Sequence, residues 1–207
     1  MKITIESPLD MHLHVREGEM LRAVMPLSAR SFAGGVIMPN LISPITSGEQ
    51  LSAYEKAVTD GCGGHHFKPF MTLFFKPYSK RELARLKPLI IGIKLYPAGI
   101  TTRSENGVRD FDAIQETVAA MEELGIPLLV HGESSGFVMD REKEFIATYR
   151  ELAENFPRLH LIMEHITTAD SIEFLARYTN VSATVTLHHL MITLDIKTFA
   201  TILNSPH

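Results

Sequence analysis

The sequence predicts an α/β fold of the (β/α)8 barrel type. Short apolar runs alternate with segments of helical period about seven times along the 207 residues, which implies right-handed crossovers between parallel strands. Polar residues stand at or near the C-terminal ends of four different strands, namely Asn40, Lys94, His131 and His165. A barrel brings those ends together at one mouth, whereas an open doubly wound sheet would spread them along a line. No glycine-rich nucleotide-binding motif supports the open sheet.

In the first half of the chain, three strands alternate with three helices. The predicted strands cover residues 8–15, 36–38 and 67–75, and the predicted helices cover residues 20–33, 47–60 and 79–86. Ser47 and Ser79 are suitable N-caps, because a serine hydroxyl accepts a hydrogen bond from a free backbone N–H. Glycines follow the first two helices, which fits their preference for helix C-termini.

A fourth strand is predicted at residues 89–96. Its apolar residues leave little polar surface, as expected for a parallel strand that is buried on both faces. A polar loop follows at residues 97–109. The remaining elements are predicted as helices at 112–124, 140–155 and 168–178, and as strands at 127–130, 160–164 and 181–186. We expect a single domain over residues 1–207, since no linker or repeat interrupts the chain.

Composition argues against several classes of protein. The formal net charge is −4 and no long basic run occurs, which argues against nucleic acid or an anionic membrane as a partner. No apolar segment approaches the roughly 20 residues of a membrane span. Cys62 is the only cysteine, so the chain cannot form an internal disulfide, and we expect a cytoplasmic location.

The motif Asp10-Met11-His12-Leu13-His14-Val15-Arg16 is the most informative part of the chain. His12 and His14 project to the same side of a strand, because strand side chains alternate with period 2. The pair alone fits a metal site or two packed histidines equally well. With His131 and His165 at the same mouth, four imidazoles can hold a borderline metal such as zinc.

Lys94 is the unusual member of this group. A lysine within an apolar strand buries a charge at a high cost in free energy. Its ammonium could extend to solvent or pair with an acid. Alternatively, CO₂ could carbamylate the amine and convert it into an anionic oxygen ligand that bridges two metals.

Six blocks of sequence together resemble one family. They are Asp10–Arg16, Met38–Leu41, Lys94–Ala98, Thr101–Thr102, Leu128–Glu133 and Glu164–Thr168. In this order they resemble dihydroorotases of the amidohydrolase superfamily, in the short bacterial form. An allantoinase or hydantoinase is a weaker alternative, because the block at Lys94 combined with the two threonines is typical of dihydroorotases.

The resemblance implies a metal centre of two Zn²⁺ ions. His12 and His14 would bind one ion, His131 and His165 the other, and Lys94 would bridge them as N6-carboxylysine. A hydroxide between the metals would attack the ring amide of dihydroorotate, and the reverse reaction would cyclise N-carbamoyl-L-aspartate in pyrimidine biosynthesis.

The resemblance also implies a binding site for this small-molecule substrate. Arg16 would clamp the substrate carboxylate with help from Asn40, while His14 and His131 would lie beside the substrate. The loop with Thr101 and Thr102 would close over it. Relatives are commonly homodimers.

Other polar residues receive weaker interpretations. Glu133 could orient a metal-binding histidine or be a solvated loop acid. His65, His66 and His160 are interpreted as lying away from the site. His188 and His189 fall on the side of the mouth but are not interpreted as ligands.

The chain departs from the family at its C-terminal end. Dihydroorotases have an aspartate after the last barrel strand that binds one metal and transfers the proton, and Asp170 and Asp195 are not placed for that role. The chain ends at residues 204–207, before any eighth strand, so we expect an N-terminal portion of a dihydroorotase with exposed edges on its first and seventh strands. The catalytic residue is therefore unassigned, and we expect severely reduced turnover. A non-catalytic protein that acts in binding or assembly is the alternative.

Overall fold

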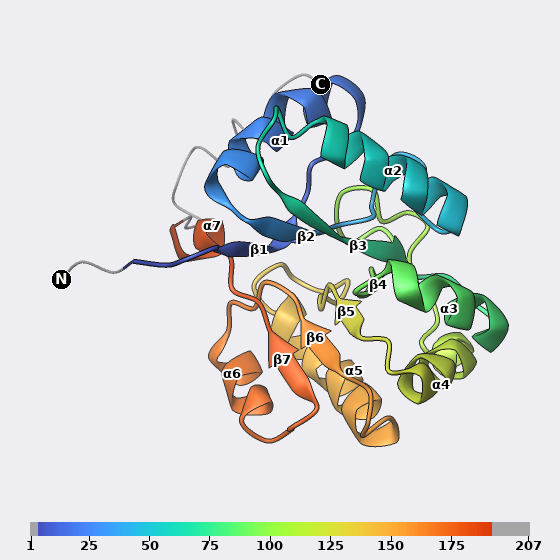
Figure 1. Cartoon of the computed structure of the whole chain (residues 1–207). Helices are drawn as coiled ribbons and strands as arrows, with labels where there is room; N and C mark the ends of the chain where they lie inside the picture. Colours follow the sequence, from blue (N-terminus) through green and yellow to red (C-terminus); the bar gives the residue numbers. More distant parts are fainter. Residues whose placement is uncertain (1–3, 192–207) are drawn as a thin grey trace.

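The computed structural model describes residues 4–191 and shows one curled sheet of seven parallel strands (Figure 1). The strands pair in chain order, and they are β1 (Leu9–Leu13), β2 (Gly34–Ile37), β3 (Lys68–Phe74), β4 (Gly92–Leu95), β5 (Leu128–Val130), β6 (Leu161–Met163) and β7 (Val181–Ala183). Within the described residues, β1 and β7 each pair on one side only. The predicted (β/α)-barrel architecture is confirmed over the seven strands of the described residues. Asp195 and residues 204–207 lie outside the described part.

Six helices connect successive strands and cover the outer face of the sheet, and a seventh follows β7 (Figure 1). They are α1 (Gly18–Ser31), α2 (Gly48–Asp60), α3 (Lys80–Leu86), α4 (Gln115–Leu124), α5 (Arg141–Asn155), α6 (Ala169–Leu175) and α7 (Leu187–Met191), with short 3₁₀ turns η1 (Lys87–Leu89) and η2 (Asp112–Ile114). No helix in residues 4–191 combines the length and apolar character that a membrane span requires.

Local sequence explains where the helices begin. Ser47 caps α2 by accepting a hydrogen bond from the backbone of Gln50, whose side chain bonds back to Ser47. Ser79 and Glu82 form the same reciprocal arrangement at α3. Both serines therefore act as the N-caps that the sequence predicts, satisfying backbone N–H groups that a helix leaves free.

The fourth strand is shorter than the sequence predicts. Pro88 lies in the turn η1, so the strand begins only at Gly92, and Ile91 outside it is 38% exposed. Gly92 itself has no room for a side chain, because a Cβ there would lie 2.5 Å from the Leu129 side chain. The predicted burial on both faces is therefore wrong for the start of the segment and holds for Gly92–Leu95.

Buried apolar residues form two clusters, one on each face of the sheet. A large cluster joins the outer face of the sheet to the helices. A small cluster of Val36, Met38 and Leu129, with Phe70 and Ile162 against it, fills the concave side. Because strand residues alternate, this concave face continues toward the C-terminal strand ends as Lys94, His131 and Glu164. The polar residues of the mouth thus rest on a small apolar floor.

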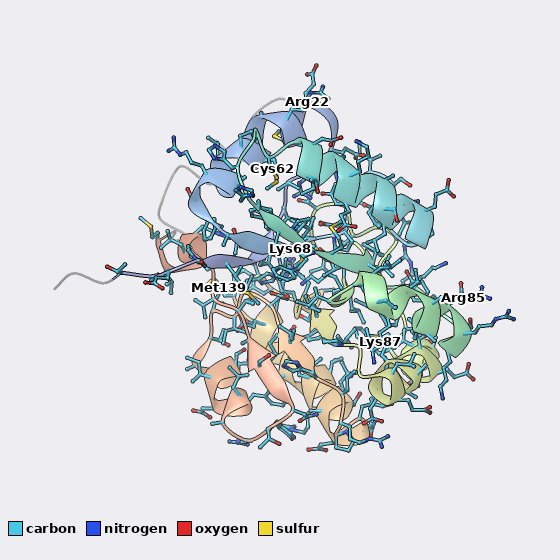
Figure 2. All side chains as sticks on the ribbon, viewed as in Figure 1. Arg22, Cys62, Lys68, Arg85, Lys87 and Met139 are labelled. Atoms are coloured by element: carbon cyan, nitrogen blue, oxygen red, sulfur yellow. The ribbon has the colours of Figure 1, made fainter. Side chains whose placement is uncertain are left out.

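Charged side chains lie mostly at the periphery, where Arg22 and Arg85 point outward (Figure 2). Cys62 is a free thiol with 4% exposure and lies in the interior (Figure 2). Its Sγ lies 3.3 Å from the carbonyl oxygen of Val58, to which the thiol donates. Burial raises the pKa of this thiol, so Cys62 packs as a small apolar residue.

Glu142 on α5 fixes the segment that follows β6. Its carboxylate accepts hydrogen bonds from the backbone N–H groups of Thr167 and Thr168 at 2.9–3.0 Å and from the Ser171 hydroxyl at 2.5 Å. Burial alone would raise the pKa of Glu142, but these hydrogen bonds outweigh it and the net pKa lies below 4.5. The carboxylate therefore stabilises the fold above about pH 4.5, and this contribution is lost as the pH falls through its folded pKa.

We expect Glu142→Gln to lower the free energy of unfolding by about 1.5–3 kcal/mol at pH 7, since the bonds lose a charged acceptor. Urea unfolding at pH 7 and pH 4 measures the loss, and the loss should shrink at the lower pH. Glu151→Gln, on the exposed side of the same helix, is the matched control. An equal loss in both variants, or a loss independent of pH, would contradict this role.

Candidate active site

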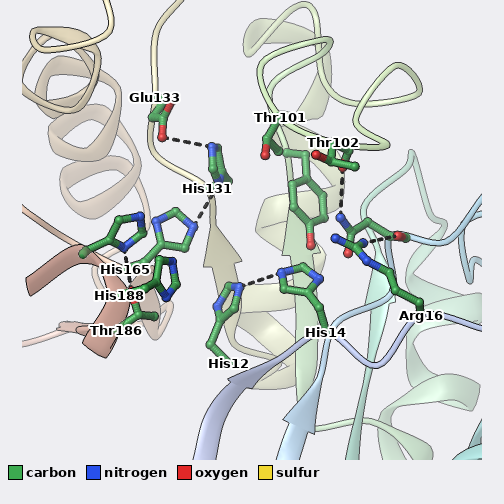
Figure 3. A pocket seen from close by; sticks show the side chains of 13 residues that line it. His12, His14, Arg16, Thr101, Thr102, His131, Glu133, His165, Thr186 and His188 are labelled. Carbon is green, nitrogen blue, oxygen red and sulfur yellow. Dashed lines mark hydrogen bonds and ion pairs between the residues drawn. The ribbon is translucent and has the colours of Figure 1, made fainter. Parts of the chain in front are cut away.

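A pocket of about 280 Å³ lies at the C-terminal ends of the strands (Figure 3). Eight predicted site residues line it, namely His12, His14, Arg16, Asn40, Thr101, Thr102, His131 and His165. Tyr96, Glu133, Thr186, His188 and His189 complete the wall. The fold thus brings together residues from β1 to the segment after β7. The remaining predicted residue, Lys94, lies beneath the lining with 0% exposure.

The four histidines form two pairs in which ring nitrogens face each other (Figure 3). Nε2 of His12 lies 3.1 Å from Nε2 of His14. Nδ1 of His131 lies 2.9 Å from Nε2 of His165. The two pairs are adjacent, because the rings of His12 and His165 have centroids 5.1 Å apart.

Burial keeps these imidazoles neutral. Desolvation is the largest cause that lowers the pKa of each ring, and the nearby charge of Lys94 lowers all four further. The pKa of His14 falls to about 2. A neutral imidazole has a free lone pair on one nitrogen, which is the form that binds a metal.

Lys94 reaches neither solvent nor a carboxylate within the described residues. Its Nζ has no hydrogen-bond partner and lies 5.0 Å from the centre of the Tyr96 ring. Desolvation lowers the pKa of this amine to about 8. Extension to solvent is therefore wrong. The amine forms no direct ion pair among the described residues, although the charge of the buried Glu164 raises its pKa, and carbamylation stays a prediction.

The donor set fits a pair of metal ions better than one ion. Within residues 4–191, no three His, Cys, Asp or Glu side chains converge on one point that could hold a metal. The imidazoles instead converge in twos, at separations close to the roughly 3.3 Å between two nitrogens of a tetrahedral zinc. Each pair therefore lacks further ligands. Lys94 is the buried group whose charge acts on all four rings, since it lowers the pKa of each.

The opposite wall of the pocket suits an anion (Figure 3). Arg16 donates to the carbonyl oxygen of Asn40 at 3.2 Å, and Asn40 donates to the carbonyl oxygen of Thr102 at 3.1 Å. No carboxylate among the described residues pairs with Arg16, although Arg103 nearby pairs with Glu17 at 3.7 Å. Desolvation and the charge of Arg103 lower the pKa of Arg16. The guanidinium of Arg16 thus offers a positive charge to a bound carboxylate.

The loop after β4 forms the roof over this wall. Pro97 pairs with Val108 at its base, and the Ser104 hydroxyl donates to the carbonyl oxygen of Thr101 at 2.7 Å. Asn40 contacts this loop through Thr102. The predicted movement of the loop as a lid stays a prediction.

Several residues of the site were missed in the sequence, among them Thr186 in the pocket lining and three residues that face inward from strands. Tyr96, Glu164 and Thr184 lie on the concave side, each two residues beyond an inward-facing position of the same strand. The period of 2 along each strand was the available signal. His165 breaks this alternation and still reaches the site, because its φ of 46° turns the backbone into the left-handed region.

Three other polar residues considered in the sequence have clear positions in the structure. His160 lies before β6 and contacts the Ser182 hydroxyl at 2.9 Å, away from the pocket. Asp170 pairs with Lys143 at 3.6 Å on the outer helices. Glu133 lies 3.3 Å from Nε2 of His131, so the first of its two interpretations agrees with the geometry.

The fold and the site define a (β/α)-barrel protein with a histidine-rich pocket at the C-terminal ends of its strands. The chain is a homologue of the dihydroorotases. It is 45% identical to the dihydroorotase of Helicobacter hepaticus over 198 residues, which are 93% of this chain and 57% of that protein. The crystal structure of the Campylobacter jejuni dihydroorotase superposes with a TM-score of 0.88 at 49% identity, covering 99% of this chain and 62% of that one.

More distant similarity concerns the fold alone. The L-hydantoinase of Arthrobacter aurescens superposes with a TM-score of 0.74 at 16% identity, covering 91% of this chain and 49% of that one. A scan against protein-family models finds no match. The chain thus spans little more than half the length of the curated relatives that it matches.

Proposed function

We propose that this chain carries the metal-binding and substrate-binding part of a zinc-dependent dihydroorotase. The reaction is the reversible conversion of N-carbamoyl-L-aspartate to (S)-dihydroorotate in pyrimidine biosynthesis. The observation that carries the proposal is the pair of imidazole couples around one buried lysine without a partner. The dihydroorotases at 45% and 49% identity support the substrate class. The cytoplasmic location and the homodimer stay predictions, and no observation favours a non-catalytic role.

The metal ligands follow from the two imidazole pairs. His12 and His14 would hold one Zn²⁺ ion, and His131 and His165 the other. The Lys94 amine would add to the carbon of CO₂ and lose a proton, and the resulting N-carboxylate would replace a buried cation by an anionic ligand for the two ions. Two ions bound there would supply a nucleophilic water at neutral pH and would polarise the amide carbonyl.

The other residues orient the substrate. Arg16 has guanidinium N–H groups beyond the one that Asn40 accepts, and these can form a two-pronged contact with the substrate carboxylate. Asn40 holds the guanidinium and the roof together, while Thr101 and Thr102 cover the ring. His14 and His131 border the same space. We assign no residue of the described part to proton transfer, because Asp170 lies on the outside.

Metal and CO₂ uptake by the full chain test this proposal. After loading with zinc and ¹³C-bicarbonate, we expect about two zinc ions per chain by mass spectrometry and a carbamate carbon by ¹³C NMR. His66→Gln, which changes an exposed histidine outside the pocket, is the control and should load equally. A chain that takes up no zinc, or takes it up without forming the carbamate, would show that the proposal is wrong.

A further inference from the structure

Glu164 is a buried acid that the proposed chemistry does not use. It follows β6 at the mouth of the half-barrel, and its side chain is 0% exposed. Its Oε2 accepts a hydrogen bond from Nδ1 of His12 at 2.7 Å and another from the Thr184 hydroxyl at 2.5 Å. Burying a carboxylate this deeply costs desolvation free energy, which its hydrogen-bond partners must offset. Its partners therefore indicate its role.

The first contact determines which nitrogen of His12 carries the proton. A carboxylate can only accept, so the proton of the neutral imidazole is held on Nδ1 and the lone pair lies on Nε2. Nε2 is the atom that faces His14 at 3.1 Å inside the pocket. The interaction between Glu164 and His12 thus selects the tautomer in which the pocket-facing nitrogen can bind a metal.

The second contact fixes the carboxylate itself. The Thr184 hydroxyl donates a hydrogen bond to Glu164 and accepts one from the backbone N–H of His165 at 2.7 Å. His165 has a φ of 46°, a conformation that non-glycine residues adopt only where surrounding contacts hold them. Thr184 therefore connects the orientation of His12 on β1 with the backbone of His165 after β6.

The other acid of the pocket makes a looser contact. Glu133 lies 3.3 Å from His131, its side chain is 31% exposed, and Arg141 at 3.8 Å competes for it. The contact between Glu164 and His12 is shorter, at 2.7 Å, and the Glu164 side chain is fully buried. It is thus better suited to hold one imidazole in one tautomer.

We propose that Glu164, fixed by Thr184, is a positioning residue that holds the proton of His12 on Nδ1 and presents Nε2 to a divalent metal ion. The inference rests on the proposed function only for the presence of the metal. The tautomer of His12 exists without metal and can be measured independently.

Two measurements on the full chain test the proposal. ¹⁵N NMR of the metal-free protein should show His12 with the proton on Nδ1, and Glu164→Gln should shift it toward a mixture of tautomers. Competition with a chromophoric zinc chelator should show zinc binding about 10–100-fold weaker in Glu164→Gln. Thr184→Val should weaken it about 2–10-fold, while Thr184→Ser retains the hydroxyl and should match the parent protein.

The outcomes separate the two proposals. A parent chain that binds no zinc contradicts the proposed function, yet its His12 tautomer still tests Glu164. If zinc affinity and tautomer are unchanged in Glu164→Gln, the positioning role is wrong. Should Glu164→Gln fail to fold by circular dichroism, the Thr184 pair decides, and equal affinities of Thr184→Val and Thr184→Ser overturn the proposal. Glu151→Gln controls for the loss of one acid.

Discussion

Replacing Lys94 with methionine is expected to abolish paired metal binding. Lys94 is 0% exposed and its Nζ has no hydrogen-bond partner, so an unbranched apolar side chain of similar length can occupy the same space. Without the amine, no carbamate can form, and the two imidazole pairs lose their shared ligand. We expect the zinc content to fall from about two ions per chain to less than one.

The same substitution should stabilise the metal-free protein near neutral pH. Burial lowers the pKa of Lys94 from 10.5 to about 8, so the unfolded chain binds more protons between these values and the parent protein gains stability as the pH rises through them. Below pH 8 the buried ammonium costs free energy, and Lys94→Met should raise the free energy of unfolding by roughly 1–3 kcal/mol. The gain should shrink toward pH 10.

Urea unfolding in CO₂-free buffer, together with zinc analysis, measures both effects of Lys94→Met. Lys68→Met, which changes an exposed lysine at the start of β3, is the control. We would abandon the assignment of Lys94 if the variant still bound two zinc ions. Lower stability of the metal-free variant at pH 7 would contradict the cost assigned to the buried amine.

Arg16→Gln is expected to produce the second large effect, on substrate binding. Arg16 lines the pocket and pairs with no carboxylate among the described residues. A two-pronged contact with a carboxylate contributes about 1.5–3 kcal/mol, so its loss should raise the Kd for dihydroorotate about 10–100-fold. Arg16→Lys keeps the charge but loses the planar guanidinium, so its Kd should lie between those of the parent protein and Arg16→Gln.

Calorimetric titration of the zinc-loaded chain with dihydroorotate measures the effect of Arg16→Gln. Binding is a better readout than turnover, because it reports the contact between Arg16 and the substrate directly. Arg22→Gln removes an exposed arginine on α1 and should leave the Kd unchanged. If Arg16→Gln binds as tightly as the parent protein, the substrate carboxylate does not contact Arg16.

Much of the fold follows from local signals in the sequence. The alternation of strands and helices, the serine caps of α2 and α3 and the glycine ends depend on residues close together in the chain. The predicted elements differ from the structure at β4 and after β7. Pro88 forms a turn that delays β4, and α7 (Leu187–Met191) was not expected after β7.

The site was predictable as a set of residues but not as a set of contacts. His12, Lys94 and His131 could be found because each interrupts an apolar strand near its C-terminal end. Glu164 was missed, because its partner His12 lies 152 positions away in the chain. The alternation along β6 indicates an inward Glu164 and an outward His165, and only the backbone turn at φ 46° places both at the mouth.

The sequence by itself determined the alternation of strands and helices and most of the polar residues at the mouth, and its motifs indicated the resemblance to dihydroorotases. These follow from the period of strands and helices and from short motifs, which are local properties of the chain. The tertiary structure decided which imidazoles pair, which nitrogen each one presents, and that Lys94 is buried without a partner. Those properties depend on distances between strands and on exclusion of water, and both arise only when the sheet curls and brings the strand ends together.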